Sequence, residues 1–245
     1  MPLRILIVSL LTWFALTSLA NAECRNLIFA EKSFTACKFD RDSDFIGVYN
    51  LDENGQPLSN FRSLNAYLGR QGRTLKFAMN AGMFGVDLKA IGLFVQDGKT
   101  QRKLNRRNGA GNFHLKPNGV FYVAGDKLGV MDTDHFAKSG IKADFATQSG
   151  PMLVIGGAIH PKLSPEGTSE KIRNGVGMVD DHTVEFVISN EPVTFYDFAS
   201  LFRDQLKCPD ALFFDGSVSN IYSPELGRGD GFIPLGPMVA VSEMK

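Results

Sequence analysis

Short apolar runs separated by turn-forming residues recur along this chain, and several of them end at a polar residue followed by glycine. Ala211–Phe214 is such a run, and it stops at Asp215 and Gly216. Four consecutive apolar residues are typical of a strand buried on both faces. We expect Asp215 to lie where backbone pairing ends and Gly216 to turn the chain with a positive φ. Taken alone, this stretch favours a simple Asx turn after a core strand.

The same design at other strand ends changes that interpretation. The run 75–79 leads into Asn80, and Ser149 precedes an apolar strand at 152–155. Lys171–Asn174 places two cations and an amide at the beginning of another strand. Loops that carry chemistry are commonly mounted at strand ends on a rigid sheet. We therefore expect these ends to converge on one polar pocket.

A polar segment between two glycines adds candidate catalytic groups. Asn112, His114, Lys116 and Asn118 alternate, so an extended chain would place all four on one face. Histidine serves as an acid or base, and lysine binds phosphate as a point charge. The polar outer face of a half-buried strand fits the same pattern equally well. The basic stretch before it, 105–112, is predicted to be a solvated loop.

Three segments have the pattern of helices. Residues 60–69 have Asn60 as a cap and Gly69 as a terminator. Residues 194–207 carry a phenylalanine and leucine stripe that is typical of a core-facing helix. A short helix is predicted at 133–138. Because no linker rich in Pro or Ser and no repeat interrupts the chain, we predict one domain over residues 23–245.

Residues 1–22 have the features of a secretory signal peptide, with a basic start, an apolar stretch and an Ala20-Asn21-Ala22 cleavage site. We therefore expect an exported chain, periplasmic or secreted, with no membrane span in its mature form. The sequence holds 26 Lys and Arg against 26 Asp and Glu. This balance does not favour a nucleic-acid partner.

Three cysteines follow the predicted signal. Segments 27–30 and 34–39 read as a hairpin in which Cys24 and Cys37 lie nearly opposite each other. In an oxidising compartment this favours a Cys24–Cys37 disulfide with Cys208 as a buried thiol. A Cys37–Cys208 bond is the alternative. No Cys or His spacing is typical of zinc.

Five segments together resemble the motifs of the phosphodiester glycosidase family: Met79–Phe84, Gly111–Gly119, Gln148–Leu153, Lys171–Gly175 and Phe214–Ser219. The resemblance covers about residues 34–241 and is strongest with the bacterial periplasmic branch. It implies an α+β fold, a single domain of mixed, mostly antiparallel sheets with a few packed helices. Many members carry two glycines after the aspartate, whereas Ser217 stands in the second place here, which we expect to narrow the pocket.

The resemblance also implies a reaction, the cleavage of a sugar-1-phosphodiester into a free sugar and a phosphomonoester. The predicted catalytic residues are Asp215, Arg173 and His114. The predicted substrate-binding residues are Asn80, Asn112, Lys116, Gln148, Ser149, Asn174, Gly216, Ser217 and Ser219. Arg173, aided by Lys116 or His114, would hold the phosphate, and Asp215 would orient water or stabilise positive charge at the sugar carbon.

Two other classes of protein would use a similar set of residues. A non-catalytic glycan-binding protein would bind the same polar ligand without forming product. A metal-dependent phosphoesterase would need further acids beside Asp215 and would lose activity in a chelator. We expect no cofactor, and calcium bound by backbone oxygens is the alternative. The expected partner is a small molecule or glycan that carries a phosphodiester, and the sugar and the oligomeric state stay open.

Overall fold

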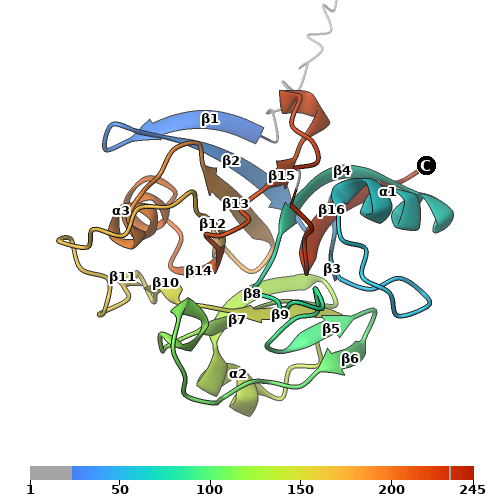
Figure 1. Ribbon diagram of the computed structural model, residues 1–245, viewed down its shortest axis with the longest axis horizontal. Helices are drawn as coiled ribbons and strands as arrows, with labels where there is room; N and C mark the ends of the chain where they lie inside the picture. The colour runs from blue at the N-terminus through green and yellow to red at the C-terminus, as the bar shows by residue number, and fades with distance from the viewer. Residues whose placement is uncertain (1–23, 232) are drawn as a thin grey trace, which may run out of the picture.

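Three antiparallel sheets build the part of the chain that the computed structural model describes, residues 24–231 and 233–245 (Figure 1). The predicted signal peptide lies outside these residues. In Figure 1 the four-stranded sheet lies on the right with α1, and the five-stranded sheet lies below with α2. The prediction of an α+β fold with mostly antiparallel sheets is confirmed.

The seven-stranded sheet carries most of the motif segments. Its strands, in spatial order, are β1 (Cys24–Phe29), β2 (Lys32–Asp40), β13 (Thr183–Ser189), β12 (Asn174–Met178), β14 (Asp210–Asp215), β10 (Met152–Ile155) and β11 (Ala158–Ile159). The predicted strand 211–214 is β14, and all four of its apolar residues are fully buried. It lies between β12 and β10, so the strand that ends at Asp215 is an interior one.

The other two sheets supply the remaining motif strands. The four-stranded sheet has the order β15 (Ile221–Tyr222), β4 (Arg73–Asn80), β16 (Met238–Met244) and β3 (Phe45–Tyr49). The five-stranded sheet has the order β6 (Lys99–Arg102), β5 (Phe94–Gln96), β9 (Phe145–Ser149), β7 (Gly119–Ala124) and β8 (Lys127–Asp132). Asn80 and Ser149 are therefore the last residues of strands in two different sheets.

One hydrophobic cluster joins all three sheets. The ring of Phe186 in β13 lies 5.4 Å from that of Phe77 in β4 and 5.8 Å from that of Phe121 in β7, between centroids. Phe214 belongs to the same cluster. Aromatic pairs at such distances add about 0.5–1.5 kcal/mol each beyond their buried area. This shared core fixes how the strand ends of one sheet lie relative to those of the next.

The helices follow the sequence pattern closely. Helix α1 (Phe61–Arg70) is capped by Asn60, whose side chain accepts a hydrogen bond from the Ser63 amide, and α2 spans Thr133–Ser139. Helix α3 (Phe195–Ser200) continues as a π-helix, Leu201–Gln205, with the Leu206 amide donating to the Leu201 carbonyl at 3.0 Å. The apolar stripe in the sequence does not distinguish the π-helix from an α-helix, because a stripe of buried residues is compatible with either.

The β1–β2 hairpin carries the predicted disulfide. Cys24 and Cys37 are paired in register, and their sulfur atoms are bonded, while Cys208 is a buried free thiol. The preferred pairing is thus confirmed over Cys37–Cys208. Among the described residues, no helix has the length and apolar character needed to span a membrane.

Candidate active site

Asp215 ends β14, and a β-bulge decides which way it points. Asn174 is paired with Asp215, whereas its neighbour Gly175 is paired with Phe213. Phe214 is therefore an extra residue on the β14 side, and without it Phe214 itself would stand opposite Asn174. Bulges of this kind often re-aim side chains beside functional sites. Here the bulge places Asp215, instead of Phe214, opposite Asn174 in the register of the two strands.

The loop after Asp215 holds the carboxylate through its backbone. The amides of Gly216 and Ser217 donate to Asp215 Oδ1 at 2.6 and 2.9 Å. The expectation of a positive φ at Gly216 is wrong, because this residue is not among those in the left-handed region. Its small size is what matters, since a Cβ there would lie 3.2 Å from Phe213 Cζ and 3.6 Å from Arg173 Nη1.

Burial tunes the acidity of this carboxyl. Asp215 is 7% exposed, and the loss of water around it raises its pKa above the ordinary value. Hydrogen bonds from the amides of Ser217, Gly216 and Val218 act in the opposite direction without cancelling the rise. A carboxylate with a raised pKa is a stronger base than an exposed one. Such perturbed groups beside cavities are typical of catalytic sites.

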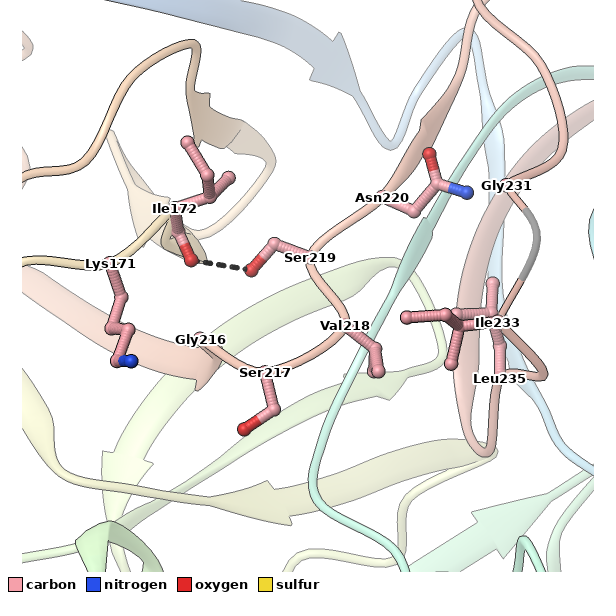
Figure 2. Close-up of a pocket in the computed structure, with 10 residues that line it drawn as sticks. All are labelled: Lys171, Ile172, Gly216, Ser217, Val218, Ser219, Asn220, Gly231, Ile233 and Leu235. Atoms are coloured by element: carbon pink, nitrogen blue, oxygen red, sulfur yellow. Dashed lines mark hydrogen bonds between the residues drawn. The ribbon is translucent and has the colours of Figure 1, made fainter.

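Two adjoining hollows flank the loop. Asp215 lines one of about 460 Å³, together with Met83, Phe84, Ile91 and Asn112. Lys171 lines the other, of about 820 Å³, with the apolar side chains of Ile172, Ile233 and Leu235. Ser217 and Val218 line both. Figure 2 shows the second hollow, with the 216–220 loop between Lys171 on one side and Ile233 and Leu235 on the other.

A buried amide network ties the strands around Asp215 together. Asn174 Nδ2 donates to the Asn80 carbonyl at 2.7 Å and lies 3.0 Å from Asn80 Oδ1. Asn80 Oδ1 also accepts from the Asn220 amide at 2.8 Å. Ser219 Oγ lies 3.0 Å from both the Ile172 and the Asp215 carbonyls; Figure 2 marks the first of these bonds. The predicted residues Asn80, Asn174 and Ser219 therefore meet at one place and hold the Asp215 loop.

Ser149 and Gln148 hold backbone instead of facing either hollow. Ser149 is fully buried, and its hydroxyl donates to the Phe214 carbonyl at 2.9 Å, directly before Asp215. Gln148 Oε1 accepts from the amides of Leu93 and Asn105 at 2.9 and 2.8 Å. Because these bonds use the polar atoms of both side chains, the geometry favours a positioning role for them over direct contact with substrate.

Arg173 lies behind the loop in a nearly closed environment. The side chain is 1% exposed, with Nε donating to the Val193 carbonyl at 2.9 Å and Nη2 to the Ser169 carbonyl at 2.6 Å. Its Cζ lies 3.6 Å from the centroid of the Phe195 ring. Burial lowers its pKa to about 10. Throughout residues 24–231 and 233–245 it forms no ion pair, so it is not the ionic partner of Asp215.

The predicted row of four polar residues on one extended face is wrong. Asn112–His114 forms a 3₁₀ turn, and the Lys116–Pro117 peptide is cis, so the strand begins only at Gly119. Asn112 lines the Asp215 hollow, but His114 and Lys116 line neither of the two hollows beside the loop. His114 Nδ1 lies 3.1 Å from the Arg107 carbonyl, and Lys116 Nζ donates to the Arg106 carbonyl at 2.8 Å. Both fasten the loop that precedes them.

Several residues that line the hollows were given no role in the prediction from the sequence, although Lys171 was noted there as one of two cations. Lys171 is exposed and stands next to the Asp215 loop, and its signal was its place two residues before the more conspicuous Arg173. Ile91, Ile233 and Leu235 have no signal in a single sequence, because isolated apolar residues in loops look like ordinary packing. In the described part of the chain, no three His, Cys, Asp or Glu side chains are grouped so that they could hold a metal ion.

With this geometry in place, comparisons with known proteins identify the class. A model of the phosphodiester glycosidase family matches residues 73–223, which include β4, β9, β12 and β14 with the loop after Asp215. The chain belongs to this family of hydrolases. The matched range contains all five motif segments, so the resemblance predicted from them is confirmed.

Two relatives extend the comparison. The chain is 38% identical over 177 residues to the Escherichia coli (strain K12) protein described as uncharacterized protein YigE, covering 72% of this chain and 69% of that one. The catalytic domain of zebrafish N-acetylglucosamine-1-phosphodiester alpha-N-acetylglucosaminidase, solved in a form auto-inhibited by its pro-peptide, superposes with a TM-score of 0.63. That match covers 92% of this chain and 85% of the other at 13% identity, and it shows a shared fold.

Proposed function

We propose that this chain hydrolyses a sugar-1-phosphodiester, releasing a free sugar and a phosphomonoester. The observation that carries the proposal is the position of Asp215, a 7% exposed carboxylate at a bulged strand end that opens on a hollow of about 460 Å³. It is the one carboxylate among the residues lining that hollow. Family membership supplies the class of reaction.

A single carboxylate suits this reaction better than ordinary glycoside hydrolysis. Glycosidases usually pair two carboxyl groups, because an alcohol leaving group must be protonated as it departs. A phosphate monoester leaves as a stable anion, whose second pKa is about 6, so a strong general acid is less necessary. Asp215 then orients the attacking water and takes up its proton as the bond from the sugar carbon to the phosphate oxygen breaks.

The placement of the cations suggests how the phosphate is held. Lys171 lines the hollow beside Ser217 and has no ion-pair partner among the described residues, so its ammonium group is available to an anion. We assign phosphate binding to Lys171 and the Ser217 hydroxyl. Arg173 contributes positive charge from behind Gly216 and positions the loop. We assign the sugar to the Asp215 hollow, which the exposed Asn112 also lines.

The mature chain should act outside the cytoplasm. A disulfide between Cys24 and Cys37 persists in oxidising compartments, and the first 22 residues have the pattern of a signal peptide. We therefore place the activity in the periplasm or in the secreted fraction. We also propose that turnover needs no metal, and the chelator arm of the following screen tests this.

One screen tests the proposal against its alternatives. The purified protein is incubated with aryl and alkyl sugar-1-phosphodiesters, with and without chelator, and released sugar and phosphomonoester are measured separately. We expect both products in equal amounts, no effect of the chelator, and a loss of about 10²–10⁴-fold in kcat for Asp215→Asn. Binding without product would favour a glycan-binding protein, and loss of activity in chelator would favour a metal-dependent phosphoesterase.

A further inference from the structure

A third hollow continues the site in a direction that the proposed reaction does not use. It has a volume of about 410 Å³ and is lined by Ile91, Gln101, Arg102, Lys103, Leu104, Asn105, Arg106 and Arg107. Ile91 also lines the Asp215 hollow, so the two adjoin. We call the third hollow the basic groove. Its lining holds four cations and no acid.

Most of this charge is not neutralised within the protein. Arg106 forms an ion pair with Asp134 at 3.0 Å. Arg102, Lys103 and Arg107 have no ion-pair partner in residues 24–231 and 233–245, and Arg107 and Lys103 are exposed. The chain as a whole has a formal net charge of +0. A local run of unpaired cations along a concave surface attracts and concentrates anions.

Protection of a sheet edge explains only part of this run. β6 is an edge strand, and cations on edge strands discourage pairing with other chains. That accounts for Lys99 and Arg102, which belong to β6. Lys103 and Arg107 follow the strand in irregular chain, where no edge needs protection. The groove therefore calls for another explanation.

The loop that carries these cations is fixed by His114, which was predicted to be catalytic, and by Lys116, which was predicted to bind substrate. His114 Nδ1 lies 3.1 Å from the Arg107 carbonyl, and Lys116 Nζ donates to the Arg106 carbonyl at 2.8 Å and to Asn108 Oδ1 at 2.9 Å. Gln148 and Asn105 hold its beginning through the Gln148 Nε2 bond to the Asn105 carbonyl at 2.8 Å. A groove held in shape before binding loses less entropy when a ligand arrives.

We propose that the basic groove binds the anionic remainder of a polymeric substrate, a glycan whose repeating units are joined by sugar-1-phosphodiesters. The inference rests on the proposed function, because such a polymer supplies both the bond that Asp215 faces and a row of phosphates beyond it. The six residues from Arg102 to Arg107 are separated by five residue steps, which span at most about 18 Å in an extended chain. That length exceeds one phosphodiester, so the groove is suited to more than one.

Binding is tested separately from turnover. Short-chain linear polyphosphate and inorganic phosphate serve as probes for the full chain, for Arg102→Gln/Lys103→Gln/Arg107→Gln, and for Lys138→Gln/Lys142→Gln/Lys162→Gln as a control of equal charge. We expect the groove variant to bind polyphosphate about tenfold more weakly than wild type, as three exposed ion contacts predict. The control variant should match wild type, and added salt should erase the difference.

Turnover is then compared on two substrates that share the same methyl phosphodiester at the sugar carbon, because the groove adjoins the Asp215 hollow and not the Lys171 hollow. In one substrate the sugar is otherwise free, and in the other a ring hydroxyl of that sugar carries an oligomer of sugar-1-phosphodiester units. The groove variant should lose kcat/KM on the oligomer alone. If the groove variant matched wild type in turnover of both substrates and in polyphosphate binding, the proposed role of the groove would be overturned and the proposed reaction would stand. Weakened polyphosphate binding with no hydrolysis of either substrate would instead refute the reaction and keep the anion groove.

A third arm identifies the class of polyanion. A short RNA oligonucleotide competes with the oligomeric glycan for the full chain carrying Asp215→Asn, which stops turnover. The proposal expects the glycan oligomer to bind more tightly, because its terminal sugar also occupies the adjoining hollow. Tighter binding of RNA would overturn the assignment to a glycan.

Discussion

Replacing Arg173 by methionine distinguishes a buried positioning residue from a group that contacts substrate. The guanidinium lies between the α3 segment and the loop after Asp215, with two backbone carbonyls and the Phe195 ring around it. Methionine keeps much of the side-chain volume but removes the charge and both hydrogen bonds. If Arg173 acts from behind the loop, the first consequence of this change is a loss of stability.

The size of that loss follows from the contacts. Each hydrogen bond from the charged donor contributes about 1.5–3 kcal/mol, and the stacking on Phe195 adds about 2 kcal/mol when desolvated. Burial opposes them: it lowers the Arg173 pKa to about 10, which corresponds to about 3 kcal/mol of lost preference for the charged form. We expect a net loss of about 2–5 kcal/mol, or roughly 10 °C in Tm for a domain of this size.

Thermal and urea unfolding measure the stability, and kcat/KM per folded molecule at low temperature measures the chemistry. Arg203→Met is the matched control, because Arg203 is partly exposed and forms its ion pair with its sequence neighbour Asp204, so its loss should change stability by less than about 0.5 kcal/mol. We expect kcat/KM of Arg173→Met to stay within about tenfold of wild type. An unchanged Tm combined with a loss of about 10²-fold in kcat/KM would refute this reasoning and restore a direct role at the phosphate.

Three further predictions concern the site and its frame. Because burial raises the pKa of Asp215 in the folded chain, folding keeps a proton that the unfolded chain loses. Stability should therefore fall as pH rises between the unfolded and folded pKa values, and urea unfolding of Asp215→Asn should lack that part of the pH dependence. Gly82→Ala should lose about 1–3 kcal/mol, since Gly82 has φ +136° and a Cβ would lie 2.8 Å from Thr147 Oγ1; Gly125→Ala, with open space around it, should lose less. Reduction of the Cys24–Cys37 bond should lower stability by about 3 kcal/mol for its sequence separation of 13, and a reductant that leaves Tm unchanged would contradict this.

The sequence pattern was sufficient to predict structure where the structure depends on residues within a single element. The run 211–214, the Asn60 cap and the stripe after Thr194 each specify their structure within a few residues, and the structure confirms them. The pairing of Cys24 with Cys37 also follows from a local hairpin, because the register of two adjacent strands is set by the turn between them.

The prediction failed where tertiary contacts override the local pattern. Alternation of Asn112, His114 and Lys116 is compatible with a strand, yet this segment forms a 3₁₀ turn, and the His114 and Lys116 side chains contact the preceding loop. The burial of Arg173 also escaped prediction, since two carbonyls and an aromatic ring from distant segments create its environment. A single sequence shows the residue but not the surroundings that decide its role.

The amide pair Asn80–Asn174 joins the four-stranded sheet to the seven-stranded sheet, and Asp215 is aligned with one of its members. Sliding of either layer past the other would break these bonds and displace the carboxylate in the same event. Loss of activity on heating and global unfolding should therefore occur at the same temperature. No temperature range is expected in which the fold is intact but the site around Asp215 is disrupted. For the proposed hydrolase, regulation by partial unfolding would therefore be difficult, and supply of substrate would be the more effective control.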